Sequence, residues 1–222
     1  RLRAENYEPD TPAPKISNTV TLRSYPAHYK KPQVLAIGSS TGGPQALFAV
    51  LKHLKDSVRD IPVIITQHMP PTFTEMLAKH ITAQTGIEAV EGQNNMPLEP
   101  GKIYVAPGGY HMIFDGKPGE VNIRLSDSPP ENFCRPAVDP MMRSILSIYP
   151  KSVLGVILTG MGQDGLRGMA QLVENNNILL AQDEASSIVW GMPGAVAKAG
   201  LCHAVLPVSE IGPKVASILS KH

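Results

Sequence analysis

A serine between glycines is the residue of this sequence best placed to act as a nucleophile. Gly38, Ser40 and Gly42 fit the spacing G-x-S-x-G, which holds a serine hydroxyl exposed on a sharp strand-to-helix turn. The glycines let the backbone bend there without a Cβ clash, and Pro44 suits the first turn of the helix that follows. The hydroxyl then stands above the sheet, beside the free N–H groups of the helix start.

The same stretch also fits two other interpretations. Small-residue turns after the first strand of an open α/β sheet often bind phosphate, and such a turn can also be purely structural. The dinucleotide fingerprint G-x-G-x-x-G and the Gly-Lys-Ser/Thr ending of the P-loop are both absent from residues 38–43. A nucleophilic serine, an anion or nucleotide cradle and a structural turn therefore all remain open for this stretch.

Two residues farther along the chain could activate the serine. His68 follows a strand-like run at 62–66, and Asp164 follows a longer one at 153–159. A serine needs an imidazole to take its proton, and a carboxylate must hold that imidazole in the correct tautomer. Because the carboxyl ends of parallel strands share one edge of a sheet, we expect Ser40, His68 and Asp164 to form a catalytic triad there.

Each of these residues also has a competitor or an ordinary structural role. His68 could bond a loop carbonyl, and Asp164 could simply cap the helix after it. His111 is the serious competitor for the base, and Asp183, which follows the strand-like run 178–181, is the reserve carboxylate.

The N–H of Thr41, directly after the serine, is the natural first oxyanion donor. Amides of the flexible turn 160–162 could converge on the same point. We expect no metal or other cofactor, because no His/Asp/Glu group has a ligand spacing such as H-x-x-x-H.

The elements that must position these residues alternate from residue 33 to the end of the chain. Strand-like runs lie at 34–37, 62–66, 87–90, 102–106, 153–159, 178–181 and 203–206, and helical segments at 45–54, 72–84, 138–148, 166–175, 194–199 and 209–219. This alternation predicts an α/β fold with three α/β/α layers around a mostly parallel, doubly wound sheet. Residues 111–125 predict one antiparallel hairpin, with Asp115-Gly116 at its turn.

Composition narrows the class of protein. The 222 residues are 42% hydrophobic and 18% charged, with a formal net charge of +1, so no basic field steers nucleic acid. No apolar run is long enough to insert into a membrane, and Cys134 and Cys202 make no disulfide framework, which favours a cytoplasmic protein. Residues 1–32 are rich in proline and polar residues and predict a linker or extended arm, followed by a catalytic domain at 33–222.

Five motifs in order resemble the catalytic domain of the chemotaxis protein-glutamate methylesterases, the CheB family. They are IGSSTGG at 37–43, QHMP at 67–70, YVAPG at 104–108, RPAVD at 135–139 and LTGMGQDG at 158–165. AQDE at 181–184 and GMP at 191–193 also match, so the resemblance covers the chain from about Val34 onward. It implies that Ser40 is the nucleophile, His68 the base and Asp164 its partner, and that the Met161 amide helps to hold the oxyanion.

The resemblance also implies a reaction and its partners. The expected reaction is hydrolysis of glutamate γ-methyl esters on the cytoplasmic helices of methylated chemoreceptors, with release of methanol, together with deamidation of receptor glutamines. An N-terminal receiver domain is the expected regulatory partner, joined through the predicted linker. The alternative function is a nucleotide- or phosphate-binding module that uses residues 38–43. One departure is Phe133-Cys134, where many relatives have His before the Arg; we expect Cys134 to pack rather than take part in chemistry.

Overall fold

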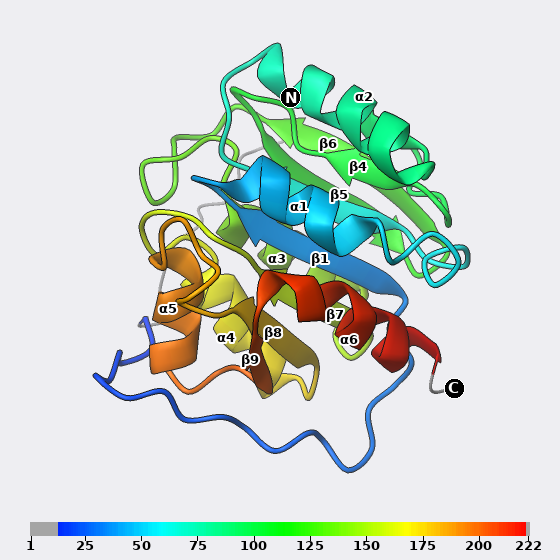
Figure 1. Cartoon of the computed structure of the whole chain (residues 1–222). Helices are drawn as coiled ribbons and strands as arrows, with labels where there is room; N and C mark the ends of the chain where they lie inside the picture. Colours follow the sequence, from blue (N-terminus) through cyan, green and yellow to red (C-terminus); the bar gives the residue numbers. More distant parts are fainter. Residues whose placement is uncertain (1–12, 221–222) are drawn as a thin grey trace.

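The computed structural model describes residues 13–220, and a seven-stranded sheet lies at its centre (Figure 1). The strand order is β3-β4-β2-β1-β7-β8-β9, and every pairing is parallel. The strands are β1 (Val34–Ser39), β2 (Val63–Gln67), β3 (Ala89–Glu91), β4 (Ile103–Val105), β7 (Val153–Ile157), β8 (Ile178–Gln182) and β9 (Ala204–Leu206). After β1 the chain first forms β2, β3 and β4 on one side of this strand, and then returns to form β7, β8 and β9 on the other side. The predicted doubly wound sheet is therefore confirmed, with its switch point at β1.

Helices cover both faces of this sheet, which gives the three predicted layers. They are α1 (Gly43–Leu51), α2 (Phe73–Thr85), α3 (Val138–Ile148), α4 (Leu166–Glu174), α5 (Met192–Lys198) and α6 (Val208–Ser220). Figure 1 shows α1 and α6 on one side of the sheet and α3 and α4 on the other. One core cluster joins α1, α2 and α6 to the sheet, and a second joins α3, α4 and α5 to the opposite face.

β1 illustrates why these runs become central strands. All six of its residues are buried. Val34 and Ala36 point into one core cluster, while Leu35 and Ile37 point into the other. Successive side chains of a strand face opposite sides, so only an unbroken apolar run satisfies a strand that is covered on both faces.

The predicted hairpin is present, but its turn lies three residues later than we expected. β5 (His111–Lys117) and β6 (Glu120–Ser126) pair antiparallel, with Asp115 opposite Asn122 and Lys117 opposite Glu120. Pro118 and Gly119 therefore form the turn, and Asp115-Gly116 is strand. This register buries the side chains of Met112, Phe114, Val121 and Ile123 together, and burial of one face outweighs a local turn signal.

The part of the predicted arm that the structure describes has neither helix nor strand. Residues 13–32 run along the domain, and their backbone binds the end of α5 and the segment after it. Ser17 N–H donates to Lys198 O at 3.0 Å, and Arg23 N–H donates to Cys202 O at 2.8 Å. Residues 1–12 of that predicted arm lie outside the described residues. Within residues 13–220, no helix has the length and apolar character needed to cross a membrane.

Candidate active site

Ser40 lies on the turn between β1 and α1, directly after the last residue of the strand. Its N–H donates to Thr159 O at 3.0 Å, and its carbonyl accepts from Gly43 N–H at 2.8 Å. Gly42 has φ 78°, and a Cβ there would lie 2.6 Å from the Ile188 side chain. Only glycine fits a left-handed position with a neighbour so close. This is the strand–turn–helix context that the G-x-S-x-G spacing requires.

The neighbouring serine has a structural role. The Ser39 hydroxyl is fully buried and donates to Gln67 Oε1 at 2.6 Å. The Gln67 amide in turn donates to the carbonyls of Ser40, at 2.8 Å, and His68, at 3.2 Å. Gln67 therefore ties the ends of β1 and β2 together and leaves the Ser40 hydroxyl, not that of Ser39, at the surface of the turn.

The sheet register places Ser40 beside His68. Ser39 is opposite Gln67, and His68 N–H donates to Ser39 O at 3.1 Å. Ser40 and His68 are thus the next residues on two adjacent strands, whose backbones are about 4.8 Å apart in a sheet. Among the described residues the Ser40 hydroxyl makes no hydrogen bond to His68, a contact that in unliganded enzymes often tightens only when substrate binds.

Asp164 reaches His68 from the loop between β7 and α4. His68 Nε2 and Asp164 Oδ2 are 2.7 Å apart, and the aspartate is only 2% exposed. The carboxylate also accepts from the backbone N–H groups of Val138, at 2.6 Å, and Asp139, at 3.2 Å. Both amides belong to the first turn of α3, where the helix dipole favours a negative charge. Asp164 therefore caps α3, not the α4 helix that follows it in sequence.

His68 is held in its protonated form more strongly than an ordinary histidine. Burial lowers the pKa of His68, but hydrogen bonds to Asp164 and Cys134 and the charge of Asp164 outweigh that effect and raise it to about 9. A raised pKa means that the surroundings stabilise the imidazolium. That is the species an acyl transfer forms when the imidazole takes a proton from the nucleophile.

Cys134 lies against the His68 ring. Its Sγ lies 3.4 Å from His68 Nδ1, the ring nitrogen that Asp164 does not use. We expected this cysteine to pack rather than to take part in chemistry. The tight turn before α3 brings the thiol to this position.

The two backbone N–H groups that we expected to be oxyanion donors lie on the loops at Ser40. The amides of Thr41 and Met161 make no hydrogen bond to any residue between 13 and 220. Gly160 packs directly on the serine, since a Cβ on Gly160 would lie 2.7 Å from Ser40 Cβ and 2.9 Å from Ser40 N. The loop that carries Met161 therefore passes over the nucleophile turn, while the Met161 side chain is 70% exposed.

The two alternative residues have structural roles. His111 is fully buried and bridges the carbonyl of Pro129, at 3.0 Å, and the N–H of Ala137, at 3.2 Å. Asp183 accepts from Ser186 N–H at 3.0 Å and shapes its own turn. Neither contacts His68 in the part of the chain that the structure describes.

Sequence reasoning missed a second buried carboxylate and the amide that joins it to Asp164. Asp139 is 2% exposed and accepts from Gly168 N–H at 2.8 Å. The Asn132 side-chain amide donates to Asp139 Oδ2 and to Asp164 Oδ1, both at 2.9 Å. The RPAVD motif places Asp139 at the start of a predicted helix, and this position could have identified it as a site residue. No feature of the sequence pointed to Asn132. Within residues 13–220 no cluster of three or more His, Cys, Asp or Glu side chains is arranged to hold a metal ion.

Comparison with known proteins identifies relatives over most of the chain. The family model described as CheB methylesterase matches residues 35–215. A protein-glutamate methylesterase/protein-glutamine glutaminase of Azospirillum brasilense is 58% identical over 207 residues, which are 91% of this chain and 52% of that protein. A protein of Rhodopseudomonas palustris with the same name is 47% identical over 96% of this chain and 55% of its own length. The chain spans about half the length of the curated relatives that it matches.

A solved structure agrees with the fold as well as the sequence. The crystal structure of the Thermotoga maritima CheB methylesterase catalytic domain superposes with a TM-score of 0.81 at 33% sequence identity. The match covers 85% of this chain and 100% of that one. These similarities support an esterase rather than a nucleotide- or phosphate-binding module at residues 38–43.

Proposed function

Because this chain belongs to the CheB methylesterase family, we propose that it is a serine esterase that hydrolyses glutamate γ-methyl esters on chemoreceptors and releases methanol. We also propose that it deamidates receptor glutamines, since a side-chain amide presents the same carbonyl to the nucleophile. The observation that carries the proposal is the His68–Asp164 pair, 2.7 Å apart, beside a serine on a nucleophile turn.

In this proposal each nitrogen of His68 has its own task. Asp164 holds Nε2, so Nδ1 takes the proton of the Ser40 hydroxyl as the oxygen attacks the γ-carbonyl. The imidazolium then gives this proton to the departing methoxide, which leaves as methanol. Water then attacks the acyl-enzyme while the same nitrogen takes one of its protons. The imidazolium gives this proton to the Ser40 oxygen as the acyl bond breaks, which releases the glutamate carboxyl and restores the Ser40 hydroxyl.

The negative oxygen of each tetrahedral intermediate needs donors that are already in place. The N–H groups of Thr41 and Met161 are the two donors in this proposal, one at the start of α1 and one on the loop that covers Ser40. Fixed backbone donors of this kind stabilise the oxyanion without reorganising during the reaction.

The rim around the proposed site is suited to a protein substrate. Phe133, Met161 and Ile188 are 102%, 70% and 73% exposed. Each is next to, or packs on, a residue of the site: Phe133 precedes Cys134, and Ile188 lies over Gly42. Exposed apolar side chains gathered around a site favour contact with another protein. The receptor helices are the proposed substrate surface, and an N-terminal receiver domain is the proposed regulatory partner.

Replacing the nucleophile tests this function. Ser40→Ala should abolish methanol release from receptor-containing membranes that carry methylated receptor, with the circular dichroism spectrum unchanged. Ser147→Ala on the exposed side of α3 is the matched control and should release methanol at the unaltered rate. Persistent methanol release by Ser40→Ala would show that another residue is the nucleophile.

A further inference from the structure

Asp164 and Asp139 form a buried pair of carboxylates behind the histidine. Both are 2% exposed, and both lie at the first turn of α3, Asp139 by sequence and Asp164 by its contacts. Burial and the negative charge of Asp164 raise the pKa of Asp139 to about 6. Asp139 therefore holds a proton to higher pH than an ordinary aspartate does.

The side-chain amide of Asn132 lies between the two carboxylates. Its Nδ2 donates one hydrogen to Asp164 Oδ1 and the other to Asp139 Oδ2, each at 2.9 Å. A carboxylate can only accept, so the orientation of this amide is determined by its partners. Among the described residues, the Asn132 amide and the His68 ring are the only side chains that donate to Asp164, and its other two donors are backbone N–H groups.

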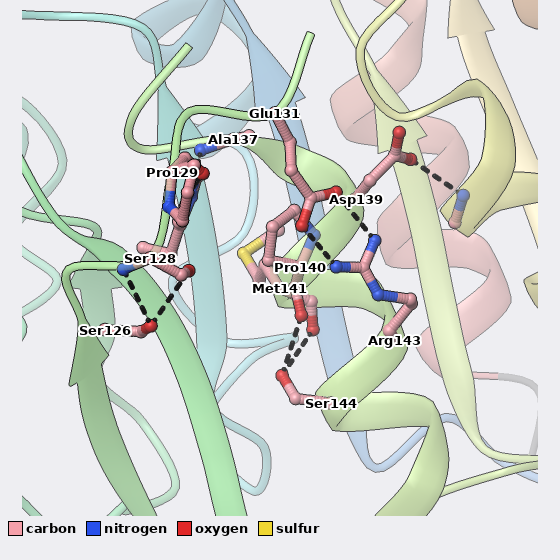
Figure 2. Close-up of polar contacts among 12 residues, drawn as sticks. Ser126, Ser128, Pro129, Glu131, Ala137, Asp139, Pro140, Met141, Arg143 and Ser144 are labelled. Carbon is pink, nitrogen blue, oxygen red and sulfur yellow. Dashed lines mark hydrogen bonds and ion pairs between the residues drawn. The ribbon is translucent and has the colours of Figure 1, made fainter. Parts of the chain in front are cut away.

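The backbone around Asn132 is built to deliver that amide. Glu131 and Cys134 exchange two backbone hydrogen bonds, at 3.1 and 2.9 Å, across a tight turn. Asn132 and Phe133, the two central residues, have φ 51° and 64°, as in a type I′ turn, where asparagine is favoured. Figure 2 shows Glu131 facing Arg143 of α3, with Nη1 2.9 Å from Oε2. The turn is therefore anchored to the helix whose start binds Asp164.

We propose that Asn132 is a positioning residue of the proposed esterase: it gives one hydrogen to each carboxylate, prevents Asp164 from sharing a proton with Asp139, and so keeps Asp164 an acceptor for His68. The inference rests on the proposed function, because it assigns Asn132 a role that acts through Asp164. A proton shared with Asp139 would weaken the bond that stabilises the imidazolium during acyl transfer. The charged or titratable groups around the pair are His68, Cys134, Glu131 and Arg143.

Two substitutions separate this role from a structural one. Asn132→Asp keeps the shape and tolerates a positive φ but removes both hydrogens, so kcat at neutral pH should fall about a hundredfold. Asn132→Gly suits the same φ and lets water donate in place of the amide, so its kcat should fall only about tenfold. Both losses should shrink as pH rises, because the shared proton leaves. Carbon-13 NMR of aspartate carboxyls should show that proton retained to higher pH in Asn132→Asp.

A second-site change provides the decisive comparison. Adding Asp139→Asn to Asn132→Gly removes the competitor for the proton and should restore most of the lost kcat. A loss that is the same at every pH, one that tracks unfolding by circular dichroism, or a double variant worse than Asn132→Gly would overturn the proposal. Ser40→Ala, measured alongside, distinguishes failure of the esterase function itself, and the NMR titration does not depend on activity.

Discussion

Asp164→Asn should remove the negative charge beside His68 while preserving the shape of the site. Asp164 accepts four hydrogen bonds, two on each carboxylate oxygen: His68 and Val138 bind Oδ2, and Asn132 and Asp139 bind Oδ1. An amide NH₂ placed at either oxygen therefore faces a backbone N–H. At least one buried backbone donor loses its acceptor in either orientation, which costs about 1–3 kcal/mol of folding stability.

The effect on catalysis should be larger than the effect on folding. An asparagine NH₂ facing His68 makes Nε2 the acceptor and puts the hydrogen on Nδ1, which is the nitrogen that takes the Ser40 proton in the proposed mechanism. The corresponding wrong tautomer in a serine protease lowers kcat by about 10⁴-fold, and we expect a loss of that order here. The pKa of His68, raised to about 9 by Asp164 and Cys134 against the lowering effect of burial, should fall.

Methanol release from methylated receptor and an NMR titration of His68 test both parts. In the unaltered chain kcat/KM should rise with pH until His68 is neutral, near its pKa of about 9. In Asp164→Asn the residual activity should reach its plateau at lower pH. Asp183 is a carboxylate after the neighbouring strand β8, so Asp183→Asn is the matched control. It should leave both methanol release and the pKa of His68 unchanged. A loss under tenfold, or a His68 pKa still near 9, would refute the reasoning.

Two further predictions concern the loops around Ser40. Gly160→Ala places a Cβ 2.7 Å from Ser40 Cβ and 2.6 Å from Met192 Sδ, so it should lower the free energy of unfolding by about 1–3 kcal/mol and reduce kcat. Thermal unfolding measures the first effect and methanol release the second. An unchanged kcat would show that this loop does not position the serine. Phe133→Ser should raise KM for methylated receptor without changing turnover of a small glutamate methyl ester. Leu22 is 53% exposed on the N-terminal arm, and Leu22→Ser is the control that should change neither quantity. Equal effects of Phe133→Ser on both substrates would show that Phe133 supports the site instead of contacting receptor.

The hairpin shows where local sequence signals were insufficient for the fold. Asp115-Gly116 is a strong turn signal, yet both residues are paired within β5 and β6. The register that buries Phe114 and Ile123 determines the pairing, and the turn is formed by the residues left over. The parallel strands were predictable for the opposite reason, since their long apolar runs carry both the local preference and the tertiary requirement.

The candidate site also has a part that the sequence predicted and a part that it did not. The contact between His68 and Asp164 could be anticipated because both follow strands of one parallel sheet, and the sheet brings such positions to a common edge. Their catalytic roles, with those of Ser40, Thr41 and Met161, remain proposals. Asn132 could not be anticipated, because it lies on a connection with no periodic relation to the strands.

The amino-acid sequence was enough to predict the alternation of strands and helices, the glycine turn around Ser40 and the positions of His68 and Asp164 after strands. Apolar periodicity and turn residues act over a few neighbours and can be read directly. Only the tertiary structure decided that α3 begins against Asp164, and that Cys134 and Asn132 reach His68 and Asp164. Those contacts depend on how α3 docks on the sheet, which is determined by packing of the whole core and not by any local stretch.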